Sequence, residues 1–122
     1  VLDPAIQELP GDVHAMCGYL EDPIPGSYDL ALCMCTSDHL TGPIAAFRNL
    51  RTAASRLCID FIDTEMMQAC KMTFKTKIDH PLYWTFVSMR KALHDAGWTI
   101  TFAGARGNRK AQRYTSTLLA CE

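Results

Sequence analysis

Short apolar runs, separated by polar segments rich in glycine and proline, dominate the pattern of this chain. The run from Tyr28 to Cys35 is apolar at nearly every position, which is typical of a strand buried on both faces of a parallel sheet. A comparable run spans 56–63, and Trp98 to Ala103 indicates a third strand. The full pattern predicts strands over 1–3, 13–17, 28–35, 56–63, 98–103 and 112–121.

Apolar residues at helical spacing separate the longer strands. Positions 44, 47, 50 and 54 fall on one helical face, and Ser37 or Thr41 can cap a helix that has Pro43 in its first turn. A second helix is predicted from about 82 or 85 to Ala96, where Gly97 suits a left-handed C-terminal cap. A short helix is also predicted over 64–70.

The order of these elements predicts an α/β fold. Strands that alternate with helices favour a mainly parallel, Rossmann-like sheet with helices on its faces. The last two strands, joined by a turn rich in glycine and arginine, predict a C-terminal antiparallel hairpin. A length of 122 residues fits one domain over 1–122.

Composition narrows the functional classes. The 12 basic and 13 acidic residues nearly balance, so we expect neither nucleic acid nor an anionic membrane surface as a partner. The chain has no apolar run long enough to span a membrane and no signal-peptide pattern, which favours a cytoplasmic protein. Six cysteines lie mostly in apolar runs without metal-type spacing, so we expect reduced core thiols and no metal site.

A polar cluster follows the first long strand. Thr36, Ser37, Asp38 and His39 come directly after Cys35, and open parallel sheets bind their ligands at the carboxyl ends of the strands. Histidine changes its charge near neutral pH, so His39, oriented by Asp38, is the best candidate for a general base. A structural alternative stays open, in which Ser37 and Asp38 cap the next helix and His39 packs over it.

Two further positions are candidates for contact with a substrate. Asp63 follows the strand over 56–63, although an acid at this position also suits the start of a helix. His80 precedes a proline and could reach over the site as part of a lid, although a surface position is the simpler interpretation.

Several short motifs, taken in order, resemble one known family. They are Leu2-Asp3, Tyr19-Leu20-Glu21-Asp22, Pro25-Gly26-Ser27-Tyr28-Asp29-Leu30, Asp38-His39-Leu40 and Leu93-His94-Asp95-Ala96-Gly97-Trp98. Together they resemble the C-terminal portion of a class I S-adenosylmethionine (SAM)-dependent methyltransferase. The resemblance covers nearly all of the chain and implies a methyltransferase-like domain, N-terminally truncated, that transfers a methyl group from SAM to an unidentified acceptor.

The resemblance also implies roles for individual residues. Residues that would contact the cofactor are Asp3, Leu20, Glu21 and Cys35, with Asp3 holding the ribose hydroxyls. Asp38 and His39 would serve catalysis. Residues that would face the methyl acceptor are Thr36, Ser37, Asp63 and His80.

One motif of the family is missing from this sequence. No Gly-x-Gly-x-Gly loop follows a strand, although such a loop lets the backbone approach the methionine end of the cofactor. Three explanations stay open: the first strand and loop lie upstream in a longer chain, the protein is a natural truncated relative, or a partner chain supplies the strand. We therefore expect a homo-oligomer or a partner chain that covers the open sheet. The alternative function is a non-catalytic methyltransferase-like subunit with an assembly or activator role.

Overall fold

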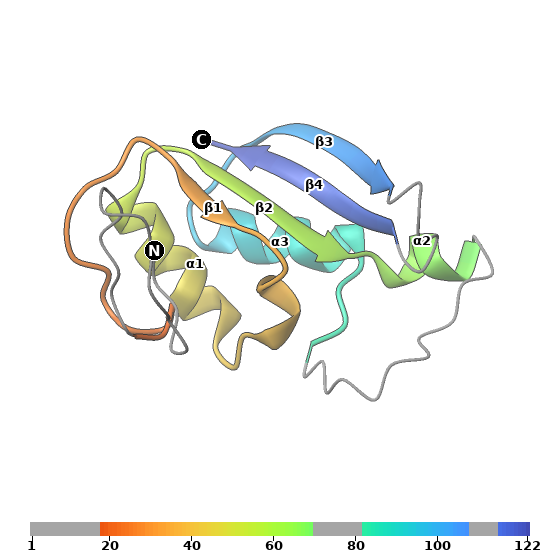
Figure 1. Cartoon of the computed structure of the whole chain (residues 1–122), viewed down its shortest axis with the longest axis horizontal. Helices are drawn as coiled ribbons and strands as arrows, with labels where there is room; N and C mark the ends of the chain where they lie inside the picture. The colour runs from red at the N-terminus through yellow and green to blue at the C-terminus, as the bar shows by residue number, and fades with distance from the viewer. Residues whose placement is uncertain (1–17, 70–81, 108–114) are drawn as a thin grey trace, which may run out of the picture.

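The computed structural model of the chain describes residues 18–69, 82–107 and 115–122 (Figure 1). The strands expected over 1–3 and 13–17 lie outside the described residues, as do the candidate residues Asp3 and His80. The described elements, in chain order, are β1 (Ala31–Cys33), the 3-10 turn η1 (Ser37–His39), α1 (Pro43–Ala53), β2 (Leu57–Ile62), α2 (Thr64–Ala69), α3 (Phe86–Asp95), β3 (Ile100–Gly107) and β4 (Thr115–Cys121).

The four described strands form one sheet in the order β1-β2-β4-β3. β1 pairs with β2 in parallel, whereas β4 is antiparallel to both β2 and β3. β1, β2 and β3 therefore share one direction and β4 runs against them. This arrangement confirms the predicted α/β fold with a C-terminal antiparallel hairpin, and it shows that the last strand inserts between β2 and β3.

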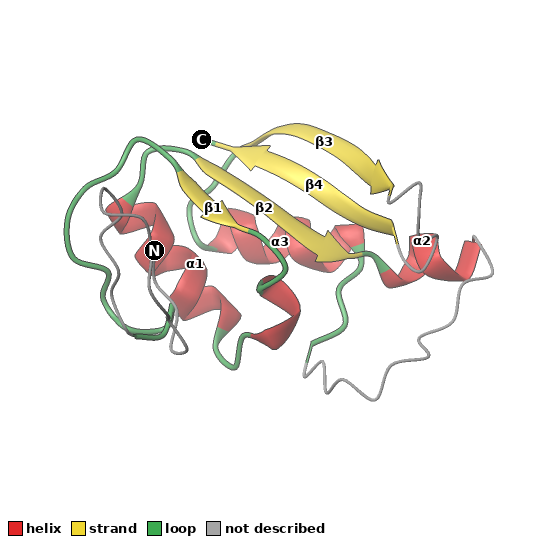
Figure 2. Ribbon diagram, in the orientation of Figure 1, coloured by secondary structure: helices red, strands yellow, loops and turns green. Residues whose placement is uncertain are grey.

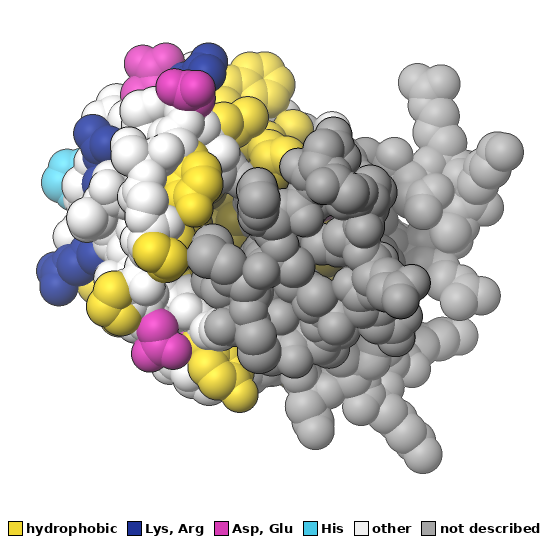
Figure 3. Space-filling model, turned by 60° about the vertical axis from the view of Figure 1, so that its left-hand side comes forward, with side chains coloured by type: hydrophobic (Ala, Val, Ile, Leu, Met, Phe, Trp, Pro, Cys, Tyr) yellow, Lys and Arg dark blue, Asp and Glu magenta, His cyan; other side chains and the backbone are white. Residues whose placement is uncertain are grey.

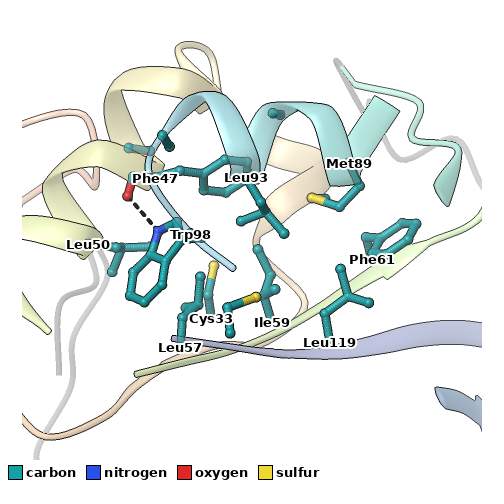
Figure 4. Close-up of a cluster of buried hydrophobic side chains, with 14 of the residues drawn as sticks. Cys33, Phe47, Leu50, Leu57, Ile59, Phe61, Met89, Leu93, Trp98 and Leu119 are labelled. Atoms are coloured by element: carbon teal, nitrogen blue, oxygen red, sulfur yellow. Dashed lines mark hydrogen bonds between the residues drawn. The ribbon is translucent and has the colours of Figure 1, made fainter. Parts of the chain in front are cut away.

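The apolar core lies on one face of the sheet. Leu57, Ile59 and Phe61 alternate along β2 and point to this face, where they meet side chains of α1 and α3. Within the described residues, both helices lie on this same side of the sheet (Figure 2). Figure 4 shows the cluster, which includes Cys33, Phe47, Leu50, Leu57, Ile59, Phe61, Met89, Leu93, Trp98 and Leu119.

Trp98 joins the two helices to the start of β3. Its ring is almost fully buried, and its indole N–H donates to the carbonyl oxygen of Phe47 at 2.9 Å (Figure 4). The guanidinium of Arg51 lies 5.0 Å from the centre of the same ring, within cation-π range. The aromatic residue of the predicted helix-end motif is thus a central packing element.

α3 begins and ends much as its sequence predicts. Thr85 and Ser88 form a reciprocal capping box at its N-terminus. Gly97 has a φ of +91°, the left-handed conformation that glycine adopts without a steric penalty. The helix signals at both ends are local, which explains why the sequence alone locates them.

The first long strand is shorter than predicted. Only Ala31–Cys33 pairs as β1, because Tyr28 makes an isolated bridge to Ala54 and Cys35 turns away at a φ of +55°. Cys33 is therefore buried in the strand, whereas Cys35, beyond its end, is exposed.

β1 forms an edge of the described sheet, although its sequence is typical of an interior strand. The Leu32 side chain is 68% exposed and that of Leu30 is 46% exposed. An edge strand normally carries charges, prolines or a bulge that discourage further pairing, whereas Ala31–Cys33 is apolar throughout.

No helix among the described residues is long and apolar enough to cross a membrane.

Candidate functional site

A pocket of about 690 Å³ runs along the outer edge of β1. Its walls come from β1, from the loop before it and from α1, and they are mainly apolar. Figure 3 views the molecule from the side of this loop and shows several hydrophobic side chains at the surface. Its lining residues include Tyr19, Leu20, Glu21, Leu32, Thr36, His39 and Thr41.

Four of the residues singled out in the sequence meet in this pocket. Leu20 and Glu21 approach it from the preceding loop, and Thr36 and His39 approach it from the segment after β1. His39 is exposed at this site. The structure thus brings together two cofactor candidates, one catalytic candidate and one candidate for contact with the acceptor.

Glu21 is fixed against the N-terminus of α1. Its Oε1 accepts hydrogen bonds from the backbone N–H of Thr41 at 2.9 Å and of Gly42 at 3.1 Å. Burial raises the pKa of the Glu21 carboxyl, but the amide hydrogen bonds from Gly42 and Thr41 outweigh it and hold that pKa below its ordinary value. Glu21 is therefore a carboxylate at neutral pH, and its negative charge interacts favourably with the positive N-terminal end of the α1 dipole.

This cap comes from outside the helix. α1 begins at Pro43 with Gly42 as its N-cap residue, and no side chain at that position caps it. The expectation that Ser37 or Thr41 caps the helix is corrected accordingly. Glycine has no side-chain acceptor, and the Glu21 carboxylate instead accepts the N–H groups of Thr41 and Gly42, which directly precede Pro43.

A second contact fastens the same loop. The side-chain amide of Asn49, on α1, donates to the carbonyl oxygens of Leu20 at 3.0 Å and Asp22 at 2.9 Å. Glu21 and Asn49 together hold the backbone of this loop against α1. The position of Leu20 in the pocket is thus set by polar contacts on both sides of it.

The chain reverses sharply after β1. Cys35 lies in the left-handed region at a φ of +55°, which costs a residue with a side chain about 1–2 kcal/mol. Its N–H donates to Oδ1 of Asp60 at 2.6 Å, and the Thr36 hydroxyl donates to the Met34 carbonyl at 2.9 Å. A charge-assisted hydrogen bond contributes roughly 1.5–3 kcal/mol, enough to offset the backbone strain.

Ser37 and Asp38 point inward from this turn. Ser37 is fully buried, and its hydroxyl donates to the carbonyl oxygen of Asp60 at 2.8 Å. The indole N–H of Trp84 donates to the Ser37 carbonyl, and the N–H of Leu82 donates to the Asp38 carbonyl. Neither Ser37 nor Asp38 lines the pocket, and Ser37 fastens the turn to β2 instead of capping α1.

Asp63 lies at the start of α2. Its Oδ1 accepts the backbone N–H of Glu65 at 3.0 Å and of Met66 at 3.2 Å, and its side chain is buried. These contacts are those of an N-cap residue. Asp63 does not line the pocket on β1, which favours the helix-cap alternative that the sequence left open.

The buried thiols belong to the core. Burial, with the nearby carboxylates of Asp60 and Asp38, raises the pKa of Cys33 to about 12. Burial, with Cys58 nearby, raises the pKa of Cys121 to about 11. Cys35 is exposed and does not line the pocket. In the part of the chain that the structure describes, no group of three metal-ligating side chains occurs.

Sequence reasoning missed Asp60 and Trp84. Asp60 is 3% exposed in the middle of an apolar strand, and an acid in such a run is itself a signal because carboxylates are seldom buried without partners. Trp84 precedes a helix and gave no comparable signal. Both residues contact the turn after β1.

The sequence matches no family model and no curated protein. The fold, in contrast, matches solved structures with probability 1.00. Magnesium protoporphyrin IX methyltransferase from Synechocystis, solved with bound SAH, is 22% identical at a TM-score of 0.64, over 88% of this chain and 49% of that one. SAM-dependent methyltransferases from Aquifex aeolicus and Clostridium acetobutylicum are 15% and 9% identical, both at a TM-score of 0.66.

These likenesses show that the chain has the Rossmann-like fold of class I SAM-dependent methyltransferases. They cover 91% of this chain and 55% of the Aquifex protein, and 88% of this chain and 63% of the Clostridium protein. The chain thus spans about half to two thirds of the length of these neighbours.

Proposed function

We propose that the chain is part of a SAM-dependent methyltransferase that transfers a methyl group to an acceptor, and that the pocket beside β1 receives the cofactor. The observation that carries the proposal is the meeting of Leu20, Glu21, Thr36 and His39 in one pocket. Neighbours of the same fold were crystallised with SAM or SAH, which supports this choice of ligand.

The chemistry of the pocket suits the adenosine part of SAM. A volume of about 690 Å³ lies within the range of small-molecule sites, roughly 300–1,000 Å³. Apolar walls at Leu20 and Tyr19 can pack against a flat base, and the Glu21 carboxylate can accept hydrogen bonds. The family resemblance adds Asp3 as the ribose contact, whereas Cys35, its other cofactor candidate, does not line this pocket.

Methyl transfer depends chiefly on positioning. Bound SAM supplies a methyl group on a positively charged sulfur. His39, exposed on η1, can take a proton from an acceptor hydroxyl or amine, and Thr36 beside it can orient that acceptor. Asp38 precedes His39 and is buried, so its proposed role is to orient that histidine.

A second function is favoured by one specific observation: the outer edge of β1 exposes Leu32. A non-catalytic subunit would use this edge for assembly with a partner chain or a second copy of itself.

Isothermal titration calorimetry with SAH separates the two functions. The methyltransferase proposal expects saturable binding of SAH that Leu20→Asp weakens strongly, because the aspartate places a second negative charge against the adenine base. Ser88→Ala, in the capping box of α3, is the control for a general loss of stability. Absence of binding at millimolar SAH would favour the assembly function.

A further inference from the structure

Asp60 is a buried carboxylate that the proposed function does not use. It lies between Ile59 and Phe61 on β2, so its side chain points away from the face that packs on α1 and α3. A carboxylate in the middle of a strand loses hydration unless hydrogen bonds compensate. Its partners therefore indicate why an acid occupies this position.

Cys35 and Ser37, in the turn after β1, are among those partners. Oδ1 of Asp60 accepts the Cys35 N–H at 2.6 Å, and Oδ2 lies 3.9 Å from the Cys35 sulfur. The backbone carbonyl of Asp60 accepts the Ser37 hydroxyl at 2.8 Å. One residue of β2 thus contacts both ends of a three-residue segment.

The conformation of that segment decides where the pocket residues lie. Cys35 has a positive φ, which residues with side chains rarely adopt unless the surroundings impose it. After this reversal, η1 begins at Ser37, with the His39 N–H donating to the Thr36 carbonyl at 2.9 Å. A different φ at Cys35 would send Thr36 and His39 along another path.

We propose that Asp60 is a positioning residue: its carboxylate holds Cys35 in the left-handed conformation and thereby places Thr36 and His39 at the pocket. The inference rests on the proposed function for the identity of the ligand. Trp84 supports the turn from the other side through its hydrogen bond to the Ser37 carbonyl. Asp60 itself does not line the pocket.

Two variants of Asp60 and one of Cys35 test this role through the affinity for SAH. Asp60→Ala removes the acceptor and is expected to raise the SAH dissociation constant about tenfold or more, the loss that a charge-assisted hydrogen bond corresponds to. Asp60→Asn keeps an oxygen for the Cys35 N–H and is expected to retain most of the affinity. Adding Cys35→Gly to Asp60→Ala removes the steric penalty and is expected to restore binding toward that of Cys35→Gly alone.

A purely structural role would give a different pattern. Unchanged SAH affinity in a folded Asp60→Ala variant overturns the proposal, and so does a loss of affinity that neither Asp60→Asn nor Cys35→Gly reverses. Should Asp60→Ala fail to fold, the Asp60→Asn variant and the double variant decide the matter. Binding by both supports the positioning role, and a folded variant of either that does not bind contradicts it.

Amide NMR separates this inference from the proposed function. In the unaltered chain the Cys35 N–H is expected to be protected from exchange, and Asp60→Ala, with or without Cys35→Gly, should abolish that protection and shift the amide signals of Thr36 and His39. This readout needs no ligand. If SAH does not bind the unaltered chain while these shifts occur, the proposed function fails, but the positioning role of Asp60 is supported. Unchanged amide signals of Thr36 and His39 in the Asp60→Ala variant would contradict that role.

Discussion

Glu21 and Gly42 are separated by a whole strand and a turn, yet Oε1 of Glu21 accepts the Gly42 N–H at 3.1 Å. This contact joins the loop before β1 to the helix after it, and both elements line the pocket. A single carboxylate therefore shapes one wall of the site and also stabilises α1. The first prediction tests this double role.

Replacing Glu21 by alanine is expected to lower the free energy of unfolding by about 1 kcal/mol, the usual cost of removing an N-terminal cap. The contribution depends on pH. Because the folded-state pKa of Glu21 lies below its ordinary value, the stabilisation is present above the unfolded-state pKa and is lost as the pH falls through the folded-state value. Urea unfolding at neutral and at acidic pH measures the difference in the free energy of unfolding between the unaltered chain and Glu21→Ala. This difference should become smaller in acid. A difference that stays constant with pH would contradict the stabilising role of the Glu21 carboxylate.

Trp98→Phe is expected to destabilise the fold by about 1–3 kcal/mol, because it removes the indole donor to the buried Phe47 carbonyl and leaves part of the buried indole space unfilled. An aromatic ring is retained, so the loss combines one hydrogen bond with the weaker packing of a smaller ring. Arg51→Met serves as the matched control for the cation-π contact and should cost less than about 1 kcal/mol. Chemical denaturation gives both values, and a Trp98→Phe variant as stable as the unaltered chain would show that this bond matters little.

The described thiols should differ sharply in reactivity. Cys35 is exposed, whereas the raised pKa values of Cys33 and Cys121, about 12 and 11, keep those thiols protonated at neutral pH. Brief treatment of the folded chain with a maleimide, followed by peptide mass spectrometry, should show labelling of Cys35. Cys33 and Cys121 should stay unlabelled until denaturant is added. Equal labelling of Cys33 in the folded chain would contradict its place in the core.

Asp63 offers a test between the two interpretations that the sequence allowed. As an N-cap residue, its replacement by alanine should cost about 1 kcal/mol of stability, and Asp63→Asn should cost much less because asparagine also caps helices. Denaturation of both variants measures this. A pair of variants that are equally stable, yet lose activity on an identified acceptor, would favour a substrate contact instead.

The elements that could be predicted from the sequence are those that local sequence signals determine. The spacing of apolar residues and Gly97 located α3, and alternating strands and helices indicated the sheet. Contacts between distant residues were not accessible in this way. The cap that Glu21 supplies to α1 and the bond from Cys35 to Asp60 join segments 21 and 25 residues apart, and no local pattern encodes such pairs.

The candidate site, too, could be predicted only as far as local sequence signals reach. The polar residues after an apolar strand directed attention to the turn at Thr36 to His39, where Thr36 and His39 line the pocket, but alternate residues of that turn face different ways. Ser37 is fully buried and His39 is exposed, because the positive φ of Cys35 and the contacts of Asp60 set the direction of the turn. The sequence over 28–35 has the pattern of a regular strand, so it does not predict the reversal at Cys35.

The most direct test of the central claim is the mapping of SAH onto the chain by amide chemical shifts. The account predicts saturable shifts at Leu20, Glu21, Thr36 and His39, which line the pocket, with little change along α3. Saturable shifts confined to other parts of the chain, or no shifts at millimolar SAH, would contradict it.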